Sequence, residues 1–585
     1  MARLTGSQII VNLLRQNGID VVFGLPGGMI LPLYDELFVS GMRHVLVRHE
    51  QAAGFMAQGM ARVTGKAAVC LATSGPGAMN LLTAVADARS DSVPLVAFTG
   101  QVNTSLIGTD AFQEADTFGL SFPITKHSIM VKSAEELLTA VPLAFAIAEG
   151  GRPGPVLIDV PRDVQTELCD IPDDFGSSFR RVYDSYEPRS FAAEGSGESL
   201  DRAVGGIVSL LAAAERPLLY VGGGCNSPAA SARVLDFLRI YDVPVISSLM
   251  GLGVVPRGMP SFLGMVGMHG TYAAGKAAYD SDLVIAAGSR FDDRAAGVPA
   301  GFCPGAKVIH IDIDAAEVNK IVPSDLSLVS DTAVAFERIC SALMTADLSA
   351  RKKEREGWLS VCMALKNDER VTLEMSCAAA DCCGERTCGM KDGIKLRNPR
   401  DFIKSLPSGD DIIVTTDVGQ HQMWAAQYFD ARRPRQFLTS GSLGTMGFGL
   451  PAAMGAAFAE PGKRIICISG DGSILMNIQE LATLAETGLN VTVIVLENGA
   501  LGMVRQQQEF LFGRRYSAST FASSPDLLSI AGGFGIRAID ADTDPDWEVK
   551  AFGMKGPAFV RTRVARCENV LPFVRGGNLN IDSIR

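Results

Sequence analysis

Short runs rich in Val, Ile and Leu alternate along the chain with helix-length segments. Such alternation is typical of β–α units arranged around a mostly parallel sheet. The first set of apolar runs is HVLVRHE, KAAVCLATSGPG, PLVAFTG and PVLIDVP; the second is PLLYVGGG, VPVISS, DLVIAAGSRFDDR and KVIHIDID; the third is DIIVTTDVGQ, RIICISGDGS, VTVIVLENG and AFVRTRV. The pattern predicts an α/β protein with three doubly wound domains.

Two polar stretches separate the three sets. DDFGSSFRRVYDSYEPRSFAAEGSGES is typical of a linker, and a second polar stretch runs from RKKEREGW into a cysteine-rich segment. We therefore expect an N-terminal domain over residues 1–185, a central domain over residues 195–350 and a C-terminal domain over residues 375–565. Doubly wound sheets bind ligands at the carboxyl ends of their strands, so the loops after the apolar runs are the first candidates for function.

The composition argues against several classes of protein. Of the 585 residues, 47% are hydrophobic and 20% are charged, which is not the signature of a disordered chain. The formal charge of −11 argues against broad attraction to nucleic acid or an anionic membrane, while a local basic site for a small anion remains compatible with it. No apolar run approaches the ~20 residues of a bilayer-spanning helix, and the start of the chain lacks the apolar core of a signal peptide. We expect a cytoplasmic protein that binds neither nucleic acid nor a membrane.

Most of the 12 cysteines stand singly in apolar runs, where a thiol behaves as a small hydrophobic group, and this favours a reducing compartment. The exceptions are Cys377, Cys382, Cys383 and Cys388. Their spacing does not match the paired CxxC of common zinc sites, so a variable surface loop is favoured over a metal site.

The most specific local motif is Gly470-Asp471-Gly472-Ser473, which follows an apolar run directly. The glycines allow close approach of the backbone to a ligand, backbone N–H groups can bind phosphate oxygens, and Asp471 offers an oxygen to Mg²⁺. After the next apolar run, 27 residues beyond Asp471, Asn498 offers an amide oxygen and Ala500 a backbone carbonyl. No GK[ST] follows, so a nucleotide-hydrolysing P-loop is not supported. The alternative is two unrelated turns, because Asp-Gly and Asn-Gly are common turn dipeptides.

A second group surrounds Arg48-His49-Glu50, at the end of another apolar run. Taken alone, Glu50 is best explained as an acid in the first turn of a helix, where it interacts favourably with the helix dipole. Two glycine-containing turns occur in the same set of runs, Pro26-Gly27-Gly28 and Ser74-Gly75-Pro76-Gly77, and the second is followed by Asn80. Their agreement with Glu50 favours a shared site.

These motifs resemble those of the thiamine diphosphate enzymes, in which GDG is followed at a similar spacing by Asn-Asn. Longer segments resemble the acetolactate synthase catalytic subunits of that family: RHEQAAGFMAQGMAR, GTDAFQEAD, ITKH, GRPGPVLIDVPRDV, GMHGTYAA, GSRFDDR, TTDVGQHQMW, LTSGSLGTMGFGLPAA, SGDGSILMNIQEL and ALGMVRQQQ. The resemblance implies thiamine diphosphate-binding folds at both ends of the chain and an FAD-binding-like central domain. It also implies thiamine diphosphate, Mg²⁺ and FAD as cofactors.

The resemblance assigns roles to individual residues. It implies that Glu50 hydrogen-bonds the aminopyrimidine ring of the cofactor and that Asp471, Asn498 and the Ala500 carbonyl hold Mg²⁺. Met446 is implied to keep the cofactor bent, although a Met in an apolar, Gly-rich run is more often plain core. The other implied thiamine diphosphate contacts are Gly27, Gly28, Pro76, Asn80, Gln420, His421, Gly444, Gly472, Ser473 and Met503. In the family the two halves of this site come from different subunits, which implies a homodimer.

Arg294 is implied to bind the carboxylate of a second 2-keto acid, because a guanidinium group can bind a carboxylate through two hydrogen bonds. A salt bridge to Asp292 or Asp293 is an equally good explanation from the sequence. Four residues are implied to line the space above the thiazolium ring, and without the resemblance they would be assigned to the core: Phe112, Gln113, Met503 and Val504. Of these, Gln113 is implied to be catalytic.

The central domain contains Gly222-Gly223-Gly224 directly after PLLYV. A glycine turn between strand and helix can accept a pyrophosphate, and a simple turn explains it about equally well. The resemblance implies that these glycines bind FAD together with Arg152, His269, Gly288, Arg290, Asp292, Asp312 and Asp331. For most of these the alternative is a surface ion pair. The flavin is implied to be largely structural.

Five departures from the family pattern stand out. Glu497 replaces the first Asn of Asn-Asn, and Arg162 replaces a common Lys. The cysteine-rich stretch from 376 to 390 is a third departure, and the ending FVRGGNLNIDSI, which lacks the usual Pro-rich tail, is a fourth. Gln507, which is implied to be catalytic, occupies the place of a Trp that favours 2-ketobutyrate. We therefore expect only a weak preference for 2-ketobutyrate over pyruvate.

The implied reaction is decarboxylation of pyruvate on thiamine diphosphate, followed by ligation of the hydroxyethyl unit to pyruvate or 2-ketobutyrate. This is the first common step of valine, leucine and isoleucine biosynthesis. Implied partners are further copies of the chain, in a homodimer or tetramer, and a small regulatory subunit. Two alternatives stay open: a related thiamine enzyme such as a pyruvate oxidase or a 2-keto acid decarboxylase, and a non-enzymatic member of the fold.

Overall fold

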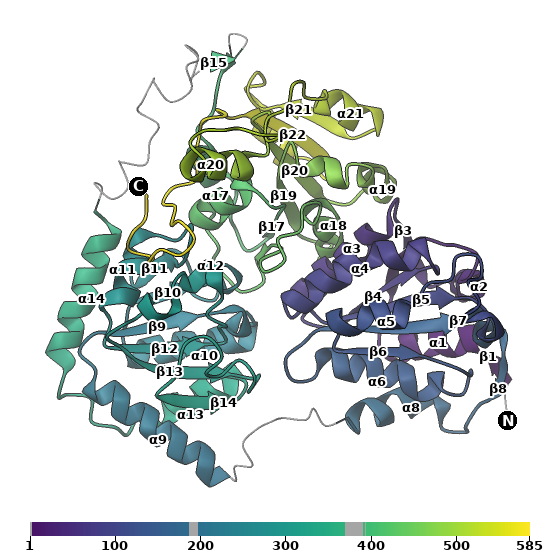
Figure 1. Cartoon of the computed structure of the whole chain (residues 1–585), viewed down its shortest axis with the longest axis horizontal. Coiled ribbons are helices and arrows are strands. Elements are labelled where there is room, and N and C mark those ends of the chain that lie inside the picture. Colours follow the sequence, from purple (N-terminus) through teal and green to yellow (C-terminus); the bar gives the residue numbers. More distant parts are fainter. Residues whose placement is uncertain (1–2, 187–196, 369–389, 392–393, 585) are drawn as a thin grey trace.

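The computed structural model describes residues 3–186, 197–368, 390–391 and 394–584, and it shows three α/β domains (Figure 1). Each domain is built on a six-stranded sheet whose paired strands all run parallel. The predicted fold class is therefore confirmed. The candidate metal or loop segment with Cys377, Cys382, Cys383 and Cys388 lies outside the described residues.

Four strands of each sheet coincide with the predicted apolar runs, and the other two strands of each sheet were not among those runs. The N-terminal sheet contains β2 (Val21–Gly24), β3 (Arg43–Leu46), β4 (Ala68–Ala72), β5 (Leu95–Gln101), β6 (His127–Met130) and β7 (Pro155–Pro161). The central sheet contains β9 (Pro217–Val221), β10 (Val245–Ser247), β11 (Phe262–Met265), β12 (Leu283–Ala287), β13 (Lys307–Asp312) and β14 (Leu326–Val329). The C-terminal sheet contains β17 (Ile412–Thr416), β18 (Phe437–Leu438), β19 (Arg464–Gly470), β20 (Val491–Glu497), β21 (Arg537–Asp540) and β22 (Ala558–Arg563). Two antiparallel pairs stand apart: β1 (Arg3–Thr5) with β8 (Leu168–Asp170), and β15 (Met390–Lys391) with β16 (Ile394–Lys395).

Helices connect and cover these strands. Those of the N-terminal domain are α1 (Gly6–Gln16), α2 (Leu31–Ser40), α3 (Glu50–Thr64), α4 (Pro76–Ser90), α5 (Thr117–Ser121), α6 (Leu137–Glu149), α7 (Arg162–Thr166) and α8 (Phe175–Asp184). The central part has α9 (Gly197–Ala213), α10 (Pro228–Ile240), α11 (Tyr272–Asp280), α12 (Asp293–Ala296), α13 (Thr332–Leu343) and α14 (Lys352–Lys366). The C-terminal domain has α16 (Pro399–Ser405), α17 (Gln420–Tyr428), α18 (Gly449–Ala459), α19 (Glu480–Thr487), α20 (Gly502–Leu511), α21 (Leu527–Gly533) and α22 (Trp547–Phe552). Across the described parts of the chain, no helix combines the length and apolar character needed to cross a bilayer.

The sheets are buried because helices cover both of their faces. Every residue of β4, β5, β7, β19 and β20 is buried. Parallel strands of this kind are nearly continuous runs of Val, Ile, Leu and Ala, which is why the sequence pattern located them.

Strand order places one switch point in each sheet. The terminal domains share an order, β3-β2-β4-β5-β7-β6 and β18-β17-β19-β20-β22-β21, which is 2-1-3-4-6-5 when each sheet is numbered from its own first strand. The central sheet, β11-β10-β9-β12-β13-β14, has the order 3-2-1-4-5-6. Ligands bind where the order reverses, outside the carboxyl ends of the strands. These places lie between β2 and β4, between β9 and β12, and between β17 and β19.

The N- and C-terminal domains meet where α3 crosses α18. The two backbones approach so closely that a Cβ atom on Gly455 would lie 1.8 Å from the Met56 carbonyl oxygen, and one on Gly59 would lie 2.1 Å from the Ala452 carbonyl oxygen. Phe55 and Phe448 pack edge to face beside this contact, with ring centroids 5.4 Å apart. Glycine is therefore required at these positions by the contact between domains.

The end of the chain returns to the central domain. The Val574 N–H donates to the Met268 carbonyl at 2.8 Å, and the Asn580 side chain donates to the Ala295 carbonyl at 2.9 Å. The atypical ending thus packs beside α12, the short helix that contains Arg294.

We expect Gly455→Ala to destabilise the protein by roughly 1–3 kcal/mol or more, because the added methyl group overlaps a backbone carbonyl that cannot move freely. Gly357→Ala is the matched control. Gly357 also lies inside a helix, and no atom lies within 4 Å of a Cβ built there. Alanine at this position should therefore stabilise the protein by about 1 kcal/mol. Denaturant unfolding of both variants measures the difference. Equal effects would contradict the close helix contact.

Candidate active site

A single large cavity of about 1250 Å³ is lined by residues of all three domains. Its lining includes the loops after β17, β19 and β20 of the C-terminal domain and those after β9, β12 and β13 of the central domain. Loops from the switch points of both sheets therefore open into one space. This volume is above the range of ordinary ligand sites and is large enough for extended ligands.

The proposed metal ligands lie together at the ends of β19 and β20. The Gly499 N–H donates to Asp471 Oδ2 at 2.7 Å, and the Ala500 N–H donates to Asn498 Oδ1 at 3.0 Å. Burial raises the pKa of Asp471 to about 6, and a divalent cation would favour its ionised form. Within the described ranges no group of three His, Cys, Asp or Glu side chains could hold a metal. The donor set of one carboxylate, one amide and a backbone carbonyl suits Mg²⁺, which takes its remaining ligands from water and phosphate oxygens.

The surroundings of Asp471 fit a diphosphate. His421 is buried and lines the cavity, and its Nε2 atom has no hydrogen-bond partner among the described residues. Burial lowers the pKa of His421 to about 3, so the ring is neutral at pH 7. A Cβ on Gly470 would lie 2.8 Å from this ring. A buried polar atom of this kind needs a partner, which a phosphate oxygen can supply.

Other predicted contacts line the same end of the cavity. They are Gln420, Gly444, Met446, Gly472, Ser473, Asn498, Ala500, Met503, Val504 and Gln507. Gln420 Oε1 accepts a hydrogen bond from Asn498 Nδ2 at 3.2 Å, which orients the amide oxygen of Asn498. Val504 is 44% exposed rather than part of the core.

The predicted flavin contacts line the other end of the cavity. They are Arg152, Gly223, Gly224, His269, Gly288, Arg290, Asp292, Asp312 and Asp331. Gly222 is not among the lining residues, because its N–H donates to the Ala287 carbonyl and a Cβ there would lie 2.1 Å from the Gly288 oxygen. His269 Nδ1 and Ser289 Oγ are buried without partners among the described residues. These glycines and unpaired polar atoms fit a large polar cofactor.

Some of the predicted flavin contacts also form ion pairs or helix caps within the protein. Arg152 Nη1 lies 2.6 Å from Glu317 Oε1 and 3.1 Å from Asp314 Oδ2, which is an ion pair. Asp292 accepts from the Ala295 N–H, and Asp331 from the Ala333 N–H, so each caps the N-terminus of a helix. These interactions occur within the lining and leave the cavity open.

Arg294 lies on α12 with 65% of its side chain exposed. Its Nε atom is 3.6 Å from Asp293 Oδ2, and its Nη1 atom is 3.6 Å from the Met268 sulfur. The salt bridge considered from the sequence is therefore present but long and exposed. The guanidinium group lines the cavity and is accessible to an anion.

The residues grouped around Glu50 form a separate cluster. Asn80 Nδ2 donates to Glu50 Oε2 at 3.0 Å, and Glu50 occupies the first turn of α3 with 8% of its surface exposed. Glu50 is thus both an acid in the first turn of a helix and a neighbour of Asn80, as the two explanations from the sequence required. Glu50 does not line the cavity, and neither do five other predicted residues: Gly27, Gly28, Pro76, Asn80 and Gln113. Phe112 is 83% exposed.

The segment before Glu50 is held by the residues that follow the GDG turn. The Arg48 N–H donates to Glu480 Oε1 at 2.8 Å, Thr483 Oγ1 donates to Glu480 Oε2 at 2.9 Å, and Asn477 Nδ2 donates to Gln51 at 3.3 Å. Glu480 is fully buried, and burial raises its pKa to about 7.

Glu497, the departure next to Asn498, points away from the cavity. Its neighbours Leu496 and Asn498 line the cavity, as alternate residues of an extended segment should, whereas Glu497 does not. Its Oε2 atom lies 3.5 Å from Arg561 Nε, and both side chains are largely buried. The carboxylate is therefore paired on the far side of the strand with an arginine that also pairs with Asp540 at 2.6 Å, and the charge of Glu497 still adds to the raised pKa of Asp471.

Asp417 is a buried residue near the site that the sequence analysis did not select. It accepts hydrogen bonds from the N–H groups of Gly447 at 2.8 Å and Gly449 at 3.3 Å, and burial raises its pKa to about 6. It directly follows the apolar run DIIVTT, so its position after a strand was the available signal. Arg62, Asp91 and Ser442 also line the cavity. None of them directly follows a predicted apolar run, so the sequence did not mark them as candidates.

Comparison with known proteins gives a consistent assignment along the whole chain. Residues 4–120, 204–339 and 417–562 match, in order, the families described as the N-terminal TPP binding domain, the central domain and the C-terminal TPP binding domain of thiamine pyrophosphate enzymes. The chain is 43% identical to acetolactate synthase isozyme 1 large subunit of Escherichia coli K12, over 100% of this chain and 98% of that protein. It is 42% identical to the isozyme 2 large subunit of the same organism, over 99% of each chain. It is also 42% identical to a probable acetolactate synthase large subunit of Methanocaldococcus jannaschii, over 94% of this chain and 89% of that protein.

The raised pKa of Glu480 makes stability depend on pH. In the folded protein Glu480 keeps its proton up to about pH 7, whereas the unfolded chain releases it near the ordinary value of 4.5. Stability should therefore fall as pH rises from about 4.5 to 7. The side chain of Glu480→Gln stays neutral at every pH. Between about pH 4.5 and 7 its free energy of unfolding should therefore rise relative to that of the wild type, by on the order of 3 kcal/mol in total. Denaturant unfolding at several pH values measures this. An equally steep pH dependence in both proteins would place the titrating group elsewhere.

Proposed function

The chain belongs to the acetolactate synthase large subunits of the thiamine pyrophosphate enzyme family, and from this membership we propose how its site residues divide the reaction. The enzyme is a thiamine diphosphate-dependent carboligase that decarboxylates pyruvate and ligates the hydroxyethyl unit to a second 2-keto acid. This is the first common step of branched-chain amino acid biosynthesis. Its cofactors are thiamine diphosphate, Mg²⁺ and FAD.

We propose that the C-terminal end of the cavity holds the diphosphate and the metal. Asp471, Asn498 and the Ala500 carbonyl would bind Mg²⁺, while His421 and the backbone around Gly472 would bind phosphate oxygens. The observation that supports this is the convergence of Asp471 and Asn498 at the ends of adjacent strands, beside the His421 Nε2 atom, which has no partner in the described part of the chain. When bound, thiamine diphosphate supplies the electron sink for decarboxylation.

We propose that Glu50 acts on a cofactor held by another copy of the chain. Glu50 and Asn80 lie outside the cavity lined by Asp471, so one chain does not bring the two halves of the site into one space. Near the Glu50 cluster, Phe112, Phe122 and Met79 are 83%, 70% and 53% exposed. Apolar side chains of this size favour burial against a partner. Two copies related by a twofold axis would complete two sites, each with Glu50 from one copy and Asp471 from the other.

Within that site Glu50 would hold a proton at its carboxylate, hydrogen-bonded to the aminopyrimidine ring, while Asn80 orients the carboxylate through the bond at 3.0 Å. Arg294 would bind the carboxylate of the second 2-keto acid, either pyruvate or 2-ketobutyrate. Gln507 on α20 lines the cavity and would contact the same acceptor. Flavin would occupy the central-domain end and serve a structural role. A small regulatory subunit is a candidate partner, as is a tetramer built from two dimers.

A product assay tests the reaction directly. Purified protein supplied with pyruvate, Mg²⁺, thiamine diphosphate and FAD should release acetolactate. Acetaldehyde as the main product would indicate a decarboxylase, and acetate formed with peroxide would indicate an oxidase.

Mixing two inactive variants tests the shared site. We expect Glu50→Gln and Asp471→Ala each to lose most activity, because one removes the proton-holding group and the other a metal ligand. When the two are unfolded and refolded together, half of the dimers pair one copy of each, and one of their two sites is intact. Activity should then recover to about a quarter of the wild-type value. Recovery should not occur if both residues act within one chain, and neither variant refolded alone should recover.

Replacing Arg294 separates ligation from decarboxylation. Arg294→Ala should raise the KM for the acceptor roughly 10- to 100-fold, because a charged hydrogen-bonding partner of the carboxylate is lost. Release of CO₂ from pyruvate should change far less. Asp293→Asn is the control, since it removes only the long ion pair. If the control reproduces the full loss, Arg294 acts through that pair and does not bind the acceptor.

A further inference from the structure

Three charged side chains form a buried cluster where α3 and α4 end. Arg62 Nη2 lies 2.8 Å from Asp91 Oδ2 and 3.7 Å from Asp87 Oδ2. The side chain of Arg62 is 7% exposed and those of both aspartates are fully buried. Gln58 ties the two helices together, because its side chain donates to the Ala84 carbonyl at 2.8 Å and accepts from Arg62 at 3.1 Å. Two carboxylates and one guanidinium group are thus held away from water.

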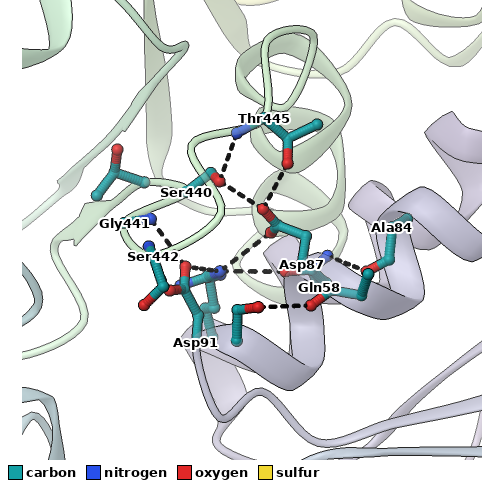
Figure 2. Close-up of polar contacts among 12 residues, drawn as sticks. Gln58, Ala84, Asp87, Asp91, Ser440, Gly441, Ser442 and Thr445 are labelled. Atoms are coloured by element: carbon teal, nitrogen blue, oxygen red, sulfur yellow. Dashed lines mark hydrogen bonds and ion pairs between the residues drawn. The ribbon is translucent and has the colours of Figure 1, made fainter. Parts of the chain in front are cut away.

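The other partners of these carboxylates come from one loop of the C-terminal domain, between β18 and α18. The Gly441 N–H donates to Asp91 Oδ2 at 2.9 Å, and the Ser442 N–H donates to Asp91 Oδ1 at 2.8 Å. Thr445 Oγ1 donates to Asp87 Oδ1 at 2.8 Å, and Ser440 Oγ donates to the same oxygen. Figure 2 shows Asp87 and Asp91 facing this loop across the domain boundary. We call residues 440–446 the bridging loop.

The bridging loop runs between the two ends of the cavity. Ser442 Oγ accepts a hydrogen bond from Arg290, a residue of the central-domain end. Met446 lines the diphosphate end and stands between two anchored neighbours, Thr445, which donates to Asp87, and Gly447, whose N–H donates to Asp417 at 2.8 Å. Buried carboxylates thus hold the residues on both sides of Met446.

Burial of two carboxylates beside a single guanidinium group is costly unless their hydrogen bonds are satisfied. The loop supplies four of those hydrogen bonds, two from backbone N–H groups and two from hydroxyls. The same contacts restrict the loop, because leaving a buried carboxylate oxygen unpaired is unfavourable. The loop conformation and the charged cluster therefore stabilise each other.

We propose that Asp87 and Asp91, with Arg62 between them, are positioning residues that fix the bridging loop so that Met446 faces thiamine diphosphate and Ser442 faces Arg290. The proposal rests on the proposed function and on the role that the resemblance implies for Met446, which lines the diphosphate end of the cavity and would keep the bound cofactor bent. Under this proposal the three residues act on the reaction through the bridging loop, with which Asp87 and Asp91 form hydrogen bonds.

Two isosteric variants separate the contributions. In Asp91→Asn one backbone N–H of the loop loses its acceptor, because an amide nitrogen cannot accept a hydrogen bond. In Asp87→Asn both hydroxyls can still donate to the single amide oxygen. We therefore expect amide hydrogen exchange at Gly441 and Ser442, measured by mass spectrometry on the cofactor-free protein, to be about tenfold faster in Asp91→Asn. In Asp87→Asn the change should be no more than about threefold. Equal, unchanged exchange in both variants would overturn the proposal.

The same variants are then loaded with thiamine diphosphate, Mg²⁺ and FAD. Deuterium exchange at the thiazolium carbon, followed by NMR, should slow about tenfold in Asp91→Asn, while the dissociation constant of thiamine diphosphate, measured by fluorescence, should change less because the metal end is intact. A looser loop with normal thiazolium exchange would show a merely structural role and refute the positioning role. Failure of the product assay, by contrast, would refute the proposed function and leave the loop measurement valid.

If Asp91→Asn does not fold, Ser440→Ala with Thr445→Val gives the test from the loop side. It removes both hydroxyl donors to Asp87 and leaves the charged cluster unchanged. Faster amide exchange across residues 440–446 with slower thiazolium exchange supports the proposal, and wild-type values for both contradict it.

Discussion

The direction of the strands in three parallel sheets decides where chemistry can occur in this protein. Because all paired strands of a sheet run the same way, every loop that follows a strand emerges at one edge, and the reversal of strand order opens a space there. In the central and C-terminal sheets these edges face each other across one cavity. The N-terminal sheet has the same strand order as the C-terminal one, and its own switch-point loops lie outside that cavity.

Contact between the N- and C-terminal domains depends on a few single residues, namely two glycines and three buried carboxylates. Gly59 and Gly455 let α3 and α18 approach to backbone contact, and only this approach brings the N-terminal helices against the loops of the C-terminal sheet. Across the boundary, Asp87 and Asp91 accept hydrogen bonds from the C-terminal domain, and Glu480 accepts one from the Arg48 N–H of the N-terminal domain. Each of these carboxylates is buried, so each needs partners from the other domain, and the domains are held in a defined arrangement.

Buried carboxylates that bind backbone N–H groups recur around the cavity. Asp417, Asp471 and Asp91 each accept from glycine N–H groups in loops that lack a sheet or helix partner. Loops that hold a cofactor must leave the regular hydrogen-bonding pattern, and their donors then need acceptors from side chains. Arg62 balances negative charge at the bridging loop, and Mg²⁺ bound at the proposed metal site would balance that of Asp471.

The amino-acid sequence alone determined the fold class, four strands of each sheet and several of the loops that line the cavity. Fully buried parallel strands are continuous apolar runs, and a motif such as GDG directly after such a run can lie only at the binding edge of its sheet. Glu497 stands out in the sequence as a departure, but the sequence does not indicate which side of the strand it faces. The roles proposed for the site residues otherwise came from resemblance, and the structure supplies their positions.

Only the tertiary structure decided which residues from distant segments of the chain lie together and which lie apart. The separation of Glu50 from the cavity, the orientation of Glu497 toward Arg561, and the cluster of Arg62, Asp87 and Asp91 with residues 440–446 all join parts of the chain that are far apart in sequence. Single charged residues within helices look like solvated surface positions in a sequence, and nothing local distinguishes one that will be buried against another domain. Their pairing becomes visible only when the packing of α3 against α18 has excluded water from the boundary.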